Sequence, residues 1–431
     1  MLDCTYRVQI PHRPGQLAAV CGVVADHDAV IGEVSTISLG RQRSIREITI
    51  EVLDSEHADA IATGLEALEG VKVLWHTDRA LLRHEGGKLQ VEPTAPVRTV
   101  QDMRDVYPPG VARVCLAIVQ DESLAMRYTT IGHTVAICTN GTRVLGLGDI
   151  GPVASMPVME GKAIFYKQCI GLDAIPILID TRVPAEFVET VMRIAKSFGG
   201  IHLEDISAPE CFEIEAALIA RLGKPVMHDD VHGTAVVTLS AALVACRQAG
   251  VRLQDAAVGQ LGLGAAGFGI AALMRDAGVR RVLASDPNPA AHERAQQRGI
   301  EIADLETVMR EAEVVVATTG RPGLIAPETV RRGQVILALT NPFPEIDPDA
   351  ALAAGAAFAA DGTSVNNVLG YPGIFRGALD AGAHSITSAM KLAAAHAIAE
   401  KTEASDLVPD VLDRSVHEHV AEAVRAAAVG V

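Results

Sequence analysis

Residues 201–235 constrain the fold more than any other stretch, because two acidic pairs each close a short apolar run there. Glu204 and Asp205 follow GGIHL, and Asp229 and Asp230 follow KPVMH. An amphipathic segment long enough for a helix separates the two runs. This strand–helix–strand order predicts that both pairs lie at the carboxyl edge of one parallel sheet, where open α/β folds bind their ligands.

Converging carboxylates at that edge predict a metal site. Three or four of them would repel each other and resist ionisation unless a cation lay among them. Hard divalent cations such as Mg2+ and Mn2+ prefer oxygen ligands. The alternative is two solvated loop ends, since acidic residues often follow strands. The second pair at the equivalent position favours the metal site.

Length and composition predict a globular protein of two or three domains. The chain has 431 residues, of which 49% are hydrophobic and 21% charged, as is typical of ordered proteins. A net charge of −16 argues against a nucleic-acid partner. No signal peptide and no apolar run of membrane-spanning length is visible. Seven scattered cysteines without a C-x-x-C motif favour a reducing, cytoplasmic location.

Residues 1–85 are expected to form a separate small domain. LDCTYRVQI and REITIEVL alternate as strands do, and the surrounding patterns complete the order βαββαβ, which is the ferredoxin-like arrangement. The loop after the first strand contains Arg13, Gly15, Gln16 and Leu17, and the glycine would let a ligand approach the backbone. This part of the chain resembles an ACT domain, which implies a small regulatory effector, often an amino acid. A plain dimerisation domain of the same fold is the alternative.

The rest of the chain predicts an α/β fold in two parts. Residues 86–99 are charged, contain Gly and Pro, and are expected to be a linker. Residues 100–228 are expected to form an α/β substrate domain. Residues 229–365 alternate strictly between strand and helix, which indicates a Rossmann-like, doubly wound domain. Residues 366–431 are mostly helical and are expected to pack back on the substrate domain.

The sequence GLGAAG predicts a dinucleotide site, because it follows an apolar strand and opens a helix. Such a turn lets pyrophosphate approach the helix N-terminus closely. The residues expected to contact the dinucleotide are Gly262, Gly264, Ala265, Ala266 and Gly267. Asp286 ends the next strand, and its carboxylate suits hydrogen bonds from a ribose 2′-hydroxyl. The same carboxylate would repel a 2′-phosphate, and PNPAAHE after it supplies no nearby cation. NAD is therefore favoured over NADP. The alternative for Asp286 is an Asx turn ahead of Pro287.

Several long motifs occur in one order: VYPPGVA, VLGLGDIGP, PVMEGKA, GGIHLEDISAPECFEIE, VMHDDVHGTA, ALTNPFPE and VNNVLGYPGIFRGALD. Over roughly residues 95–400 the chain resembles malic enzymes of the short bacterial form. The resemblance implies that NAD(P)+ and Mg2+ or Mn2+ support oxidative decarboxylation of malate to pyruvate. It also implies a homodimer or homotetramer.

The resemblance assigns roles residue by residue. Tyr107 in VYPPGVA matches the family's general acid, Lys162 in PVMEGKA its general base, and Asp229 a carboxylate beside the metal. The implied metal ligands are Glu204, Asp205 and Asp230. A lysine buried near the cation is expected to have a lowered pKa, so that it accepts the malate hydroxyl proton as hydride leaves for NAD+. Pro108 departs from the family, which usually has Ser or Thr there.

The remaining implied contacts concern substrate and coenzyme. Arg143, directly before VLGLGD, matches an arginine that holds a substrate carboxylate. The asparagines implied at the substrate and nicotinamide are Asn341, Asn366 and Asn367. The predicted cofactor-binding set also contains Thr318 and Asn341. His228 and His232 are expected to lie outside the metal's own ligand set.

Other interpretations of these residues stay open at this point. Each of three residues has an alternative, structural interpretation. Lys162 would be an exposed lysine at a helix start, and Tyr107 would be a loop tyrosine packed on prolines. Arg143 would pair with Asp149 or Glu160. A metal-independent amino-acid dehydrogenase and a non-catalytic sensor of dinucleotide or dicarboxylate are the alternative functions.

Overall fold

The computed structural model describes residues 2–144, 146–363 and 365–428. Leu145 of VLGLGDIGP and the last three residues of the expected helical tail therefore lie outside the described residues. The chain forms two compact units, residues 1–90 and residues 91–431. Among the described helices, none is long and apolar enough to cross a membrane.

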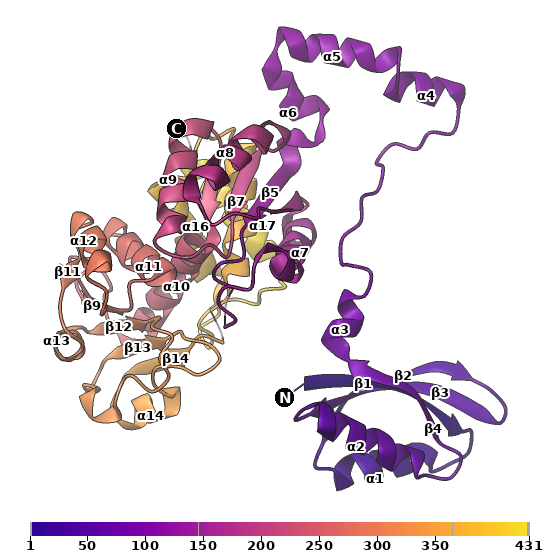
Figure 1. Ribbon diagram of the computed structural model, residues 1–431. Helices are drawn as coiled ribbons and strands as arrows, with labels where there is room; N and C mark the ends of the chain where they lie inside the picture. The colour runs from indigo at the N-terminus through magenta and orange to yellow at the C-terminus, as the bar shows by residue number, and fades with distance from the viewer. Residues whose placement is uncertain (1, 145, 364, 429–431) are drawn as a thin grey trace. The chain divides into compact units, whose positions relative to one another are not determined.

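The N-terminal unit is a four-stranded antiparallel sheet with two helices on one face (Figure 1). Its elements are β1 (Leu2–Pro11), α1 (Gln16–Asp26), β2 (Val30–Leu39), β3 (Arg43–Val52), α2 (Ser55–Glu66), β4 (Lys72–Asp78) and the short helix α3 (Arg79–His84). The sheet order is β2-β3-β1-β4, so the predicted βαββαβ order is confirmed. Alternate strand residues such as Tyr6 and Ile48 are fully buried in the core with α1 and α2, which explains the alternating sequence pattern.

The second unit begins with three helices: α4 (Val100–Val106), α5 (Gly110–Gln120) and α6 (Ala125–Tyr128). We call residues 100–128 the arm. None of the residues in these three helices is buried. Thr99 caps α4 by accepting a hydrogen bond from the N–H of Asp102, so the helix is well terminated even though it lacks a packed face.

A four-stranded parallel sheet follows the arm, with the order β6-β5-β7-β8. Its strands are β5 (Thr134–Thr139), β6 (Asp173–Leu178), β7 (Gly200–Leu203) and β8 (Val226–His228). The connecting helices are α7 (Pro152–Ile170), α8 (Pro184–Ile194) and α9 (Glu210–Leu222). All residues of β5, β7 and β8 are buried, as expected for a parallel sheet covered on both faces.

The second sheet has six parallel strands in the order β11-β10-β9-β12-β13-β14. Its strands are β9 (Ala257–Leu261), β10 (Arg281–Ser285), β11 (Glu301–Ile302), β12 (Val314–Ala317), β13 (Val335–Ala338) and β14 (Phe358–Asp361). Its helices are α10 (Asp229–Ala249), α11 (Ala265–Asp276), α12 (Pro289–Gln297), α13 (Leu305–Glu311) and α14 (Pro348–Ala353). This strand order is that of the doubly wound dinucleotide-binding fold, which confirms the predicted Rossmann-like domain.

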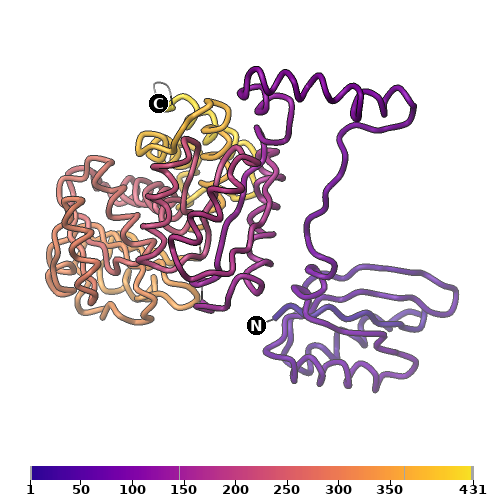
Figure 2. The backbone as a smooth tube through the Cα atoms, turned by 45° about the horizontal axis from the view of Figure 1, so that its top comes forward, coloured from indigo at the N-terminus to yellow at the C-terminus, as the bar shows by residue number. Residues whose placement is uncertain are grey.

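Helix α10 joins the two sheets, because it contacts β8 of the first and β13 and β14 of the second (Figure 1). The C-terminal helices are α15 (Tyr371–Asp380), α16 (Ser388–Lys401) and α17 (Arg414–Ala427). Figure 2 shows these helices, in yellow, against the part of the unit that contains the first sheet, and α15 and α17 pack on α7. Short 3-10 helices occupy Glu122–Leu124, Thr130–His133, Ala195–Ser197, Pro327–Thr329 and Asn367–Leu369.

Candidate active site

Both acidic pairs lie at the carboxyl edge of the first sheet. Strands β7 and β8 are parallel neighbours; Glu204 and Asp205 directly follow β7, and Asp229 and Asp230 open α10 directly after β8. The N–H of Asp205 donates to Oδ2 of Asp230 over 2.9 Å. One carboxylate oxygen each from Glu204, Asp205 and Asp230 lie within 4.8 Å of one another. The predicted convergence of the two pairs is therefore confirmed.

The burial of these carboxylates favours a bound cation. Burial, together with the charges of Glu204 and Asp230, raises the pKa of Asp205 to about 9. Burial raises the pKa of Glu204 to about 8, although Lys162 lowers it. Oδ2 of Asp205 is buried without a hydrogen-bond partner among the described residues, and its backbone has the left-handed φ of 53°. A strained residue with an orphaned oxygen among other oxygens fits Mg2+ or Mn2+.

Lys162 lies in the middle of α7 and is only 8% exposed. Its Nζ donates to Oδ2 of Asp229 over 2.5 Å and lies 3.1 Å from Oε1 of Glu204. It also lies 4.8 Å from the centre of the Tyr371 ring. The interpretation of Lys162 as an exposed lysine at a helix start is therefore wrong.

The lowered pKa of Lys162 was predicted for a lysine beside a bound cation, and in the chain by itself this pKa is shifted in the opposite direction. Burial alone would lower this pKa, but the carboxylates of Asp229 and Glu204 raise it well above the ordinary lysine value. The sequence suggested burial near a cation but gave no sign that two carboxylates would contact the ammonium directly.

Gly233 leaves space for the carboxylate of Asp229 one helical turn earlier. A Cβ atom at Gly233 would lie 1.8 Å from Oδ1 of Asp229. We expect Gly233→Ala to displace that carboxylate from Lys162 and lower kcat by roughly 10²-fold, because small displacements of catalytic groups are costly. Steady-state kinetics on folded protein measure this. Gly22→Ala in α1, where nothing lies within 4 Å, is the matched control. Equal kcat for the two variants would show that the position of Asp229 is unimportant.

Glu215 of α9 holds the turn that carries Asp229 and Asp230. Its Oε1 accepts the N–H of His228 over 2.7 Å, and its Oε2 lies 3.0 Å from Nε2 of His232. Burial would raise the pKa of Glu215, but His232 and these hydrogen bonds lower it to about 2. Nδ1 of His228 lies 3.7 Å from Oδ2 of Asp230.

His202 and Tyr166 are buried residues that were not predicted from the sequence, and they complete the site. His202 lies two positions before Glu204, with its Nε2 2.6 Å from Oε2 of that carboxylate. Its Nδ1 lies 2.9 Å from the hydroxyl of Tyr166. Burial lowers the pKa of His202 to about 4. The alternation of a strand was the one available signal, since it places positions 202 and 204 on the same face.

Arg143, the predicted ligand of a substrate carboxylate, lies in a loop beside the acidic pairs. The N–H of Arg143 donates to the carbonyl of Asp205 over 3.1 Å, so its loop adjoins the acidic pairs, and its side chain is exposed. Asp149 pairs with Arg182 over 2.8 Å, and no ion pair of the described chain joins Arg143 to Asp149 or Glu160. The structural interpretation of Arg143 is therefore wrong.

The predicted asparagines make local hydrogen bonds. Asn341 donates through Nδ2 to the carbonyl of Gly362 over 3.1 Å. Oδ1 of Asn366 accepts the N–H of Val368 over 3.0 Å, and Asn367 begins a 3-10 helix.

Tyr107 directly follows α4 in the arm and is 69% exposed. No hydrogen bond or ring contact of the described residues joins it to Lys162, and the chain by itself does not bring the two together. The interpretation of Tyr107 as packed on prolines is not supported by this exposure.

The glycine-rich turn has the predicted strand–turn–helix context between β9 and α11. Gly262 has a φ of 87°, and a Cβ there would lie 2.8 Å from the carbonyl oxygen of Thr318. A Cβ at Gly267 would lie 2.0 Å from the carbonyl oxygen of Gly262, whereas Gly264 faces open space. Gln260 donates to the carbonyl of Gly262 and to Oγ1 of Thr318, which fixes the turn against β12. Ala265 and Ala266 begin α11.

Asp286 forms the Asx turn that was the alternative interpretation. Its Oδ1 accepts the N–H of Asn288, and its Oδ2 accepts the N–H of Leu263, each over 2.7 Å. Each carboxylate oxygen has a second lone pair, which can accept a hydrogen bond from a ribose hydroxyl.

PNPAAHE itself contains no Lys or Arg, as predicted, but a cation follows it directly. Arg294 directly follows PNPAAHE, and α12 brings it close enough to interact electrostatically with Asp286. Its guanidinium carbon lies 4.3 Å from the Phe212 ring centre and 5.3 Å from that of Phe268. Arg294 is thus stacked on aromatic rings.

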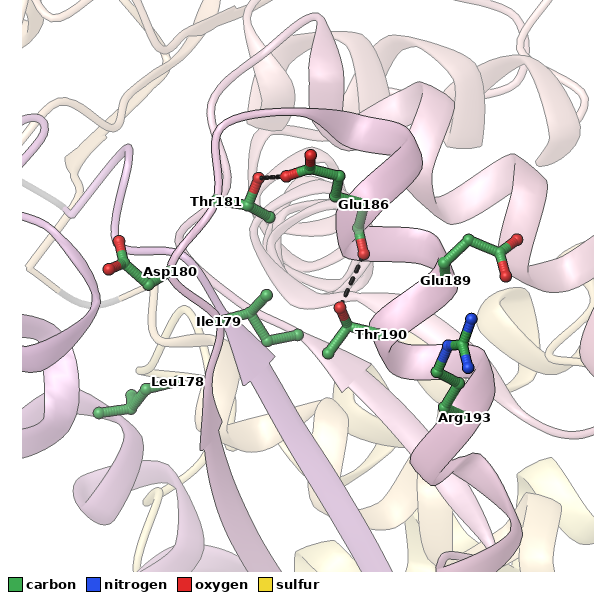
Figure 3. A pocket seen from close by; sticks show the side chains of 8 residues that line it. All are labelled: Leu178, Ile179, Asp180, Thr181, Glu186, Glu189, Thr190 and Arg193. Carbon is green, nitrogen blue, oxygen red and sulfur yellow. Dashed lines mark hydrogen bonds between the residues drawn. The ribbon is translucent and has the colours of Figure 1, made fainter.

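A separate open cavity of about 500 Å³ lies at the end of β6 and the start of α8 (Figure 3). Thr181 and Glu186 on its wall share a hydrogen bond of 2.6 Å. None of the predicted site residues lines it.

The fold and the site define a two-domain α/β dehydrogenase, with a Rossmann-like domain beside a lysine surrounded by carboxylates. Residues 86–219 match the family model of the malic enzyme N-terminal domain. Residues 239–322 match that of the NAD binding domain of D-isomer specific 2-hydroxyacid dehydrogenases.

Relatives that match almost the whole chain identify the family within this class of dehydrogenases. NAD-dependent malic enzyme 1 of Bacillus subtilis is 50% identical over 427 residues, covering 99% of this chain and 97% of that protein. NAD-dependent malic enzyme of Geobacillus stearothermophilus is 40% identical over 454 residues, covering 99% and 94%. The crystal structure of NAD-dependent malic enzyme from Thermotoga maritima gives a TM-score of 0.75 at 35% identity, covering 81% of this chain and 99% of that one. The chain belongs to the malic enzyme family.

Proposed function

We propose that the chain oxidises L-malate to pyruvate and CO2 with reduction of NAD+, in the presence of Mg2+ or Mn2+. The observation that carries the proposal is the buried contact of Lys162 with Asp229 and Glu204, directly beside Asp205 and Asp230. Its 50% identity to an NAD-dependent malic enzyme over 427 residues supports the same activity. Its seven free cysteines suit a reducing compartment, so the proposal includes a cytoplasmic location.

The metal would be held by Glu204, Asp205 and Asp230, and when bound it supplies Lewis-acid polarisation of the malate oxygens. Lys162 is proposed to accept the hydroxyl proton as hydride leaves C2 for NAD+. Lys162 must be neutral to do this, so the negative charges that raise its pKa have to be balanced before turnover. Arg143 would orient a malate carboxylate, and loss of CO2 from the β-keto acid would leave a carbanionic C3 for protonation by Tyr107.

The direct test is absorbance at 340 nm with L-malate, Mn2+ and either NAD+ or NADP+, with pyruvate measured as product. We expect faster reduction of NAD+, since the carboxylate of Asp286 disfavours a 2′-phosphate. Faster reduction of NADP+ would contradict the coenzyme assignment. Absence of reduction with either coenzyme, in folded protein, would contradict the proposed reaction and favour the sensor interpretation.

We further propose a homodimer in which the arm packs on a second copy. The three arm helices contain no buried residue, yet they present exposed apolar side chains. The largest exposed fractions are those of Val119 (81%) and Val100 (70%). Helices with several exposed apolar side chains and no buried residue are typical of interaction sites. Packing on a second copy would also let Tyr107 enter the partner's site, which its own chain does not do.

Mixing two inactive variants tests this arrangement. Tyr107→Phe and Lys162→Ala should each have low activity alone. Random re-association makes about half of the dimers mixed, and each mixed dimer has one site with both native residues, so roughly a quarter of wild-type activity should return. Activity is measured after unfolding and refolding the mixture. Activity that equals the mean of the two variants would show that Tyr107 does not act across subunits.

We propose that the N-terminal unit is an ACT-like regulatory domain for a small effector. Gly15 precedes α1 with a φ of 83°, and nothing lies within 4 Å of the position of its Cβ. Arg13, Gln16 and Leu17 flank this open space in sequence and are the proposed contacts of the effector.

Deleting residues 1–85 should leave kcat near the full-length value, because they lie in a unit that is compact by itself and contribute no residue to the proposed chemistry. Regulation by small molecules such as amino acids, or the oligomeric state, should change. Kinetics and sedimentation of the truncated and full-length proteins measure both effects. Complete loss of activity in a folded truncation would contradict this division.

A further inference from the structure

Two parallel contacts connect helix α7 to strand β7 at the buried edge of the site. Lys162 and Tyr166 are one helical turn apart on α7, so they lie on the same face. His202 and Glu204 are two positions apart along β7 and its end, so they also share a face. Lys162 lies 3.1 Å from Oε1 of Glu204, and the Tyr166 hydroxyl lies 2.9 Å from Nδ1 of His202.

The proton positions in this group follow from its donors and acceptors. As a metal ligand Glu204 is ionised and only accepts hydrogen bonds, so Nε2 of His202, 2.6 Å from Oε2 of Glu204, then carries the proton. The Tyr166 hydroxyl has no other acceptor within reach among the described residues, and it donates to Nδ1. The hydrogen bond from Tyr166 thereby selects the imidazole tautomer in which Nε2 is the donor.

Aromatic rings enclose this pair and exclude water. His202, Tyr166, Tyr371 and Phe375 are all fully buried. The His202 ring lies 5.2 Å from Tyr371 and is stacked 5.8 Å from Phe375. No solvent molecule is therefore at hand to replace either hydrogen bond, and the orientation of the Glu204 carboxylate depends on these side chains.

We propose that Tyr166 and His202 are positioning residues that hold the Glu204 carboxylate in one orientation. Oε2 contacts His202 and Oε1 lies 3.1 Å from Lys162, so both oxygens of this carboxylate are held in place. This inference rests on the proposed function, because it assigns Glu204 as a metal ligand. Partners that orient a ligating carboxylate typically contribute 10- to 100-fold to metal affinity.

Mn2+ affinity, measured by the EPR signal of free Mn2+ in titrations of the full chain, tests the proposal. Tyr166→Phe removes only the hydroxyl and should weaken Mn2+ binding about 10-fold, and His202→Leu about 10- to 100-fold. NADH binding and far-UV circular dichroism should be unchanged. Tyr6→Phe is the matched control, because it also removes one buried tyrosine hydroxyl, which donates to the carbonyl of Ala58 over 2.9 Å in the N-terminal unit.

A double-mutant cycle separates positioning from general packing. The amide of His202→Gln can donate to Glu204 without a tautomeric partner, so adding Tyr166→Phe to it should weaken Mn2+ binding no further. Wild-type Mn2+ affinity in Tyr166→Phe would overturn the proposal. The proposal would also be overturned if Tyr166→Phe weakened Mn2+ binding as much in the His202→Gln background as in the wild-type background. Asp230→Asn tests the metal site separately, because loss of this ligand should abolish the specific Mn2+ site. A wild type with no specific Mn2+ site, or an Asp230→Asn protein with wild-type Mn2+ affinity, would show that the proposed metal site itself fails.

Discussion

Replacing Lys162 with alanine is expected to lower kcat by at least ~10²–10⁴-fold, the usual contribution of one acid–base group. The Nζ atom is the one amine in contact with both Asp229 and Glu204 in the described structure, so no neighbouring lysine can replace it. NADH binding should remain close to wild type, because the glycine-rich turn lies in the other domain. Stopped-flow and steady-state kinetics with NADH fluorescence measure the two effects.

Lys167→Ala is the matched control for this prediction. Lys167 lies on the same helix, but its side chain is 61% exposed and pairs with Asp173 over 2.7 Å. Its loss should leave kcat nearly unchanged. Lys162→Ala also leaves buried carboxylates without a cation, which destabilises proteins by about 3–5 kcal/mol, so folding has to be verified by circular dichroism. A folded Lys162→Ala protein with wild-type kcat would contradict the assignment of the general base.

Removing divalent cations with EDTA is expected to abolish malate oxidation, and added Mn2+ should restore it. Malate turnover in the proposed mechanism requires a counter-charge for carboxylates that lie within 4.8 Å of one another. Absorbance at 340 nm before chelation, after chelation and after addition of Mn2+ measures this. Activity that survives complete chelation would favour the metal-independent dehydrogenase that the sequence left as an alternative.

The same cation should stabilise the fold increasingly as pH rises. Burial raises the pKa of Asp205 to about 9 and that of Glu204 to about 8, whereas an unfolded chain has values near 4. The folded chain without metal thus binds more protons than the unfolded chain, and its stability falls as pH rises between about 4 and 9. The increase in Tm caused by Mn2+ should be larger at about pH 8.5 than at about pH 5.5. An increase that is constant across this range would contradict the proposed ligands.

Local patterns were sufficient to predict the two sheet edges where the candidate sites lie. An apolar run followed by an acidic pair is a local feature, and parallel pairing of β7 with β8 then brings Glu204 and Asp230 together. The turn at Gly262 was also predictable from a local pattern, namely glycines between an apolar strand and a helix. The structure explains why glycine is needed there, since its φ is 87° and its Cβ position is crowded. The N-terminal βαββαβ order followed from strands with one buried face.

What the sequence alone determined is therefore the α/β architecture, the Rossmann-like turn and the convergence of the acidic pairs. Only the tertiary structure decided which side chains contact each other across elements. Tyr166 and His202 are 36 residues apart, and their hydrogen bond depends on the rotation of α7 against β7. Likewise, the direction in which α12 turns Arg294 toward Phe212 was decided by packing. Periodicity specifies the buried face of an element, whereas its rotation and partner depend on how side chains from distant segments fill the same space.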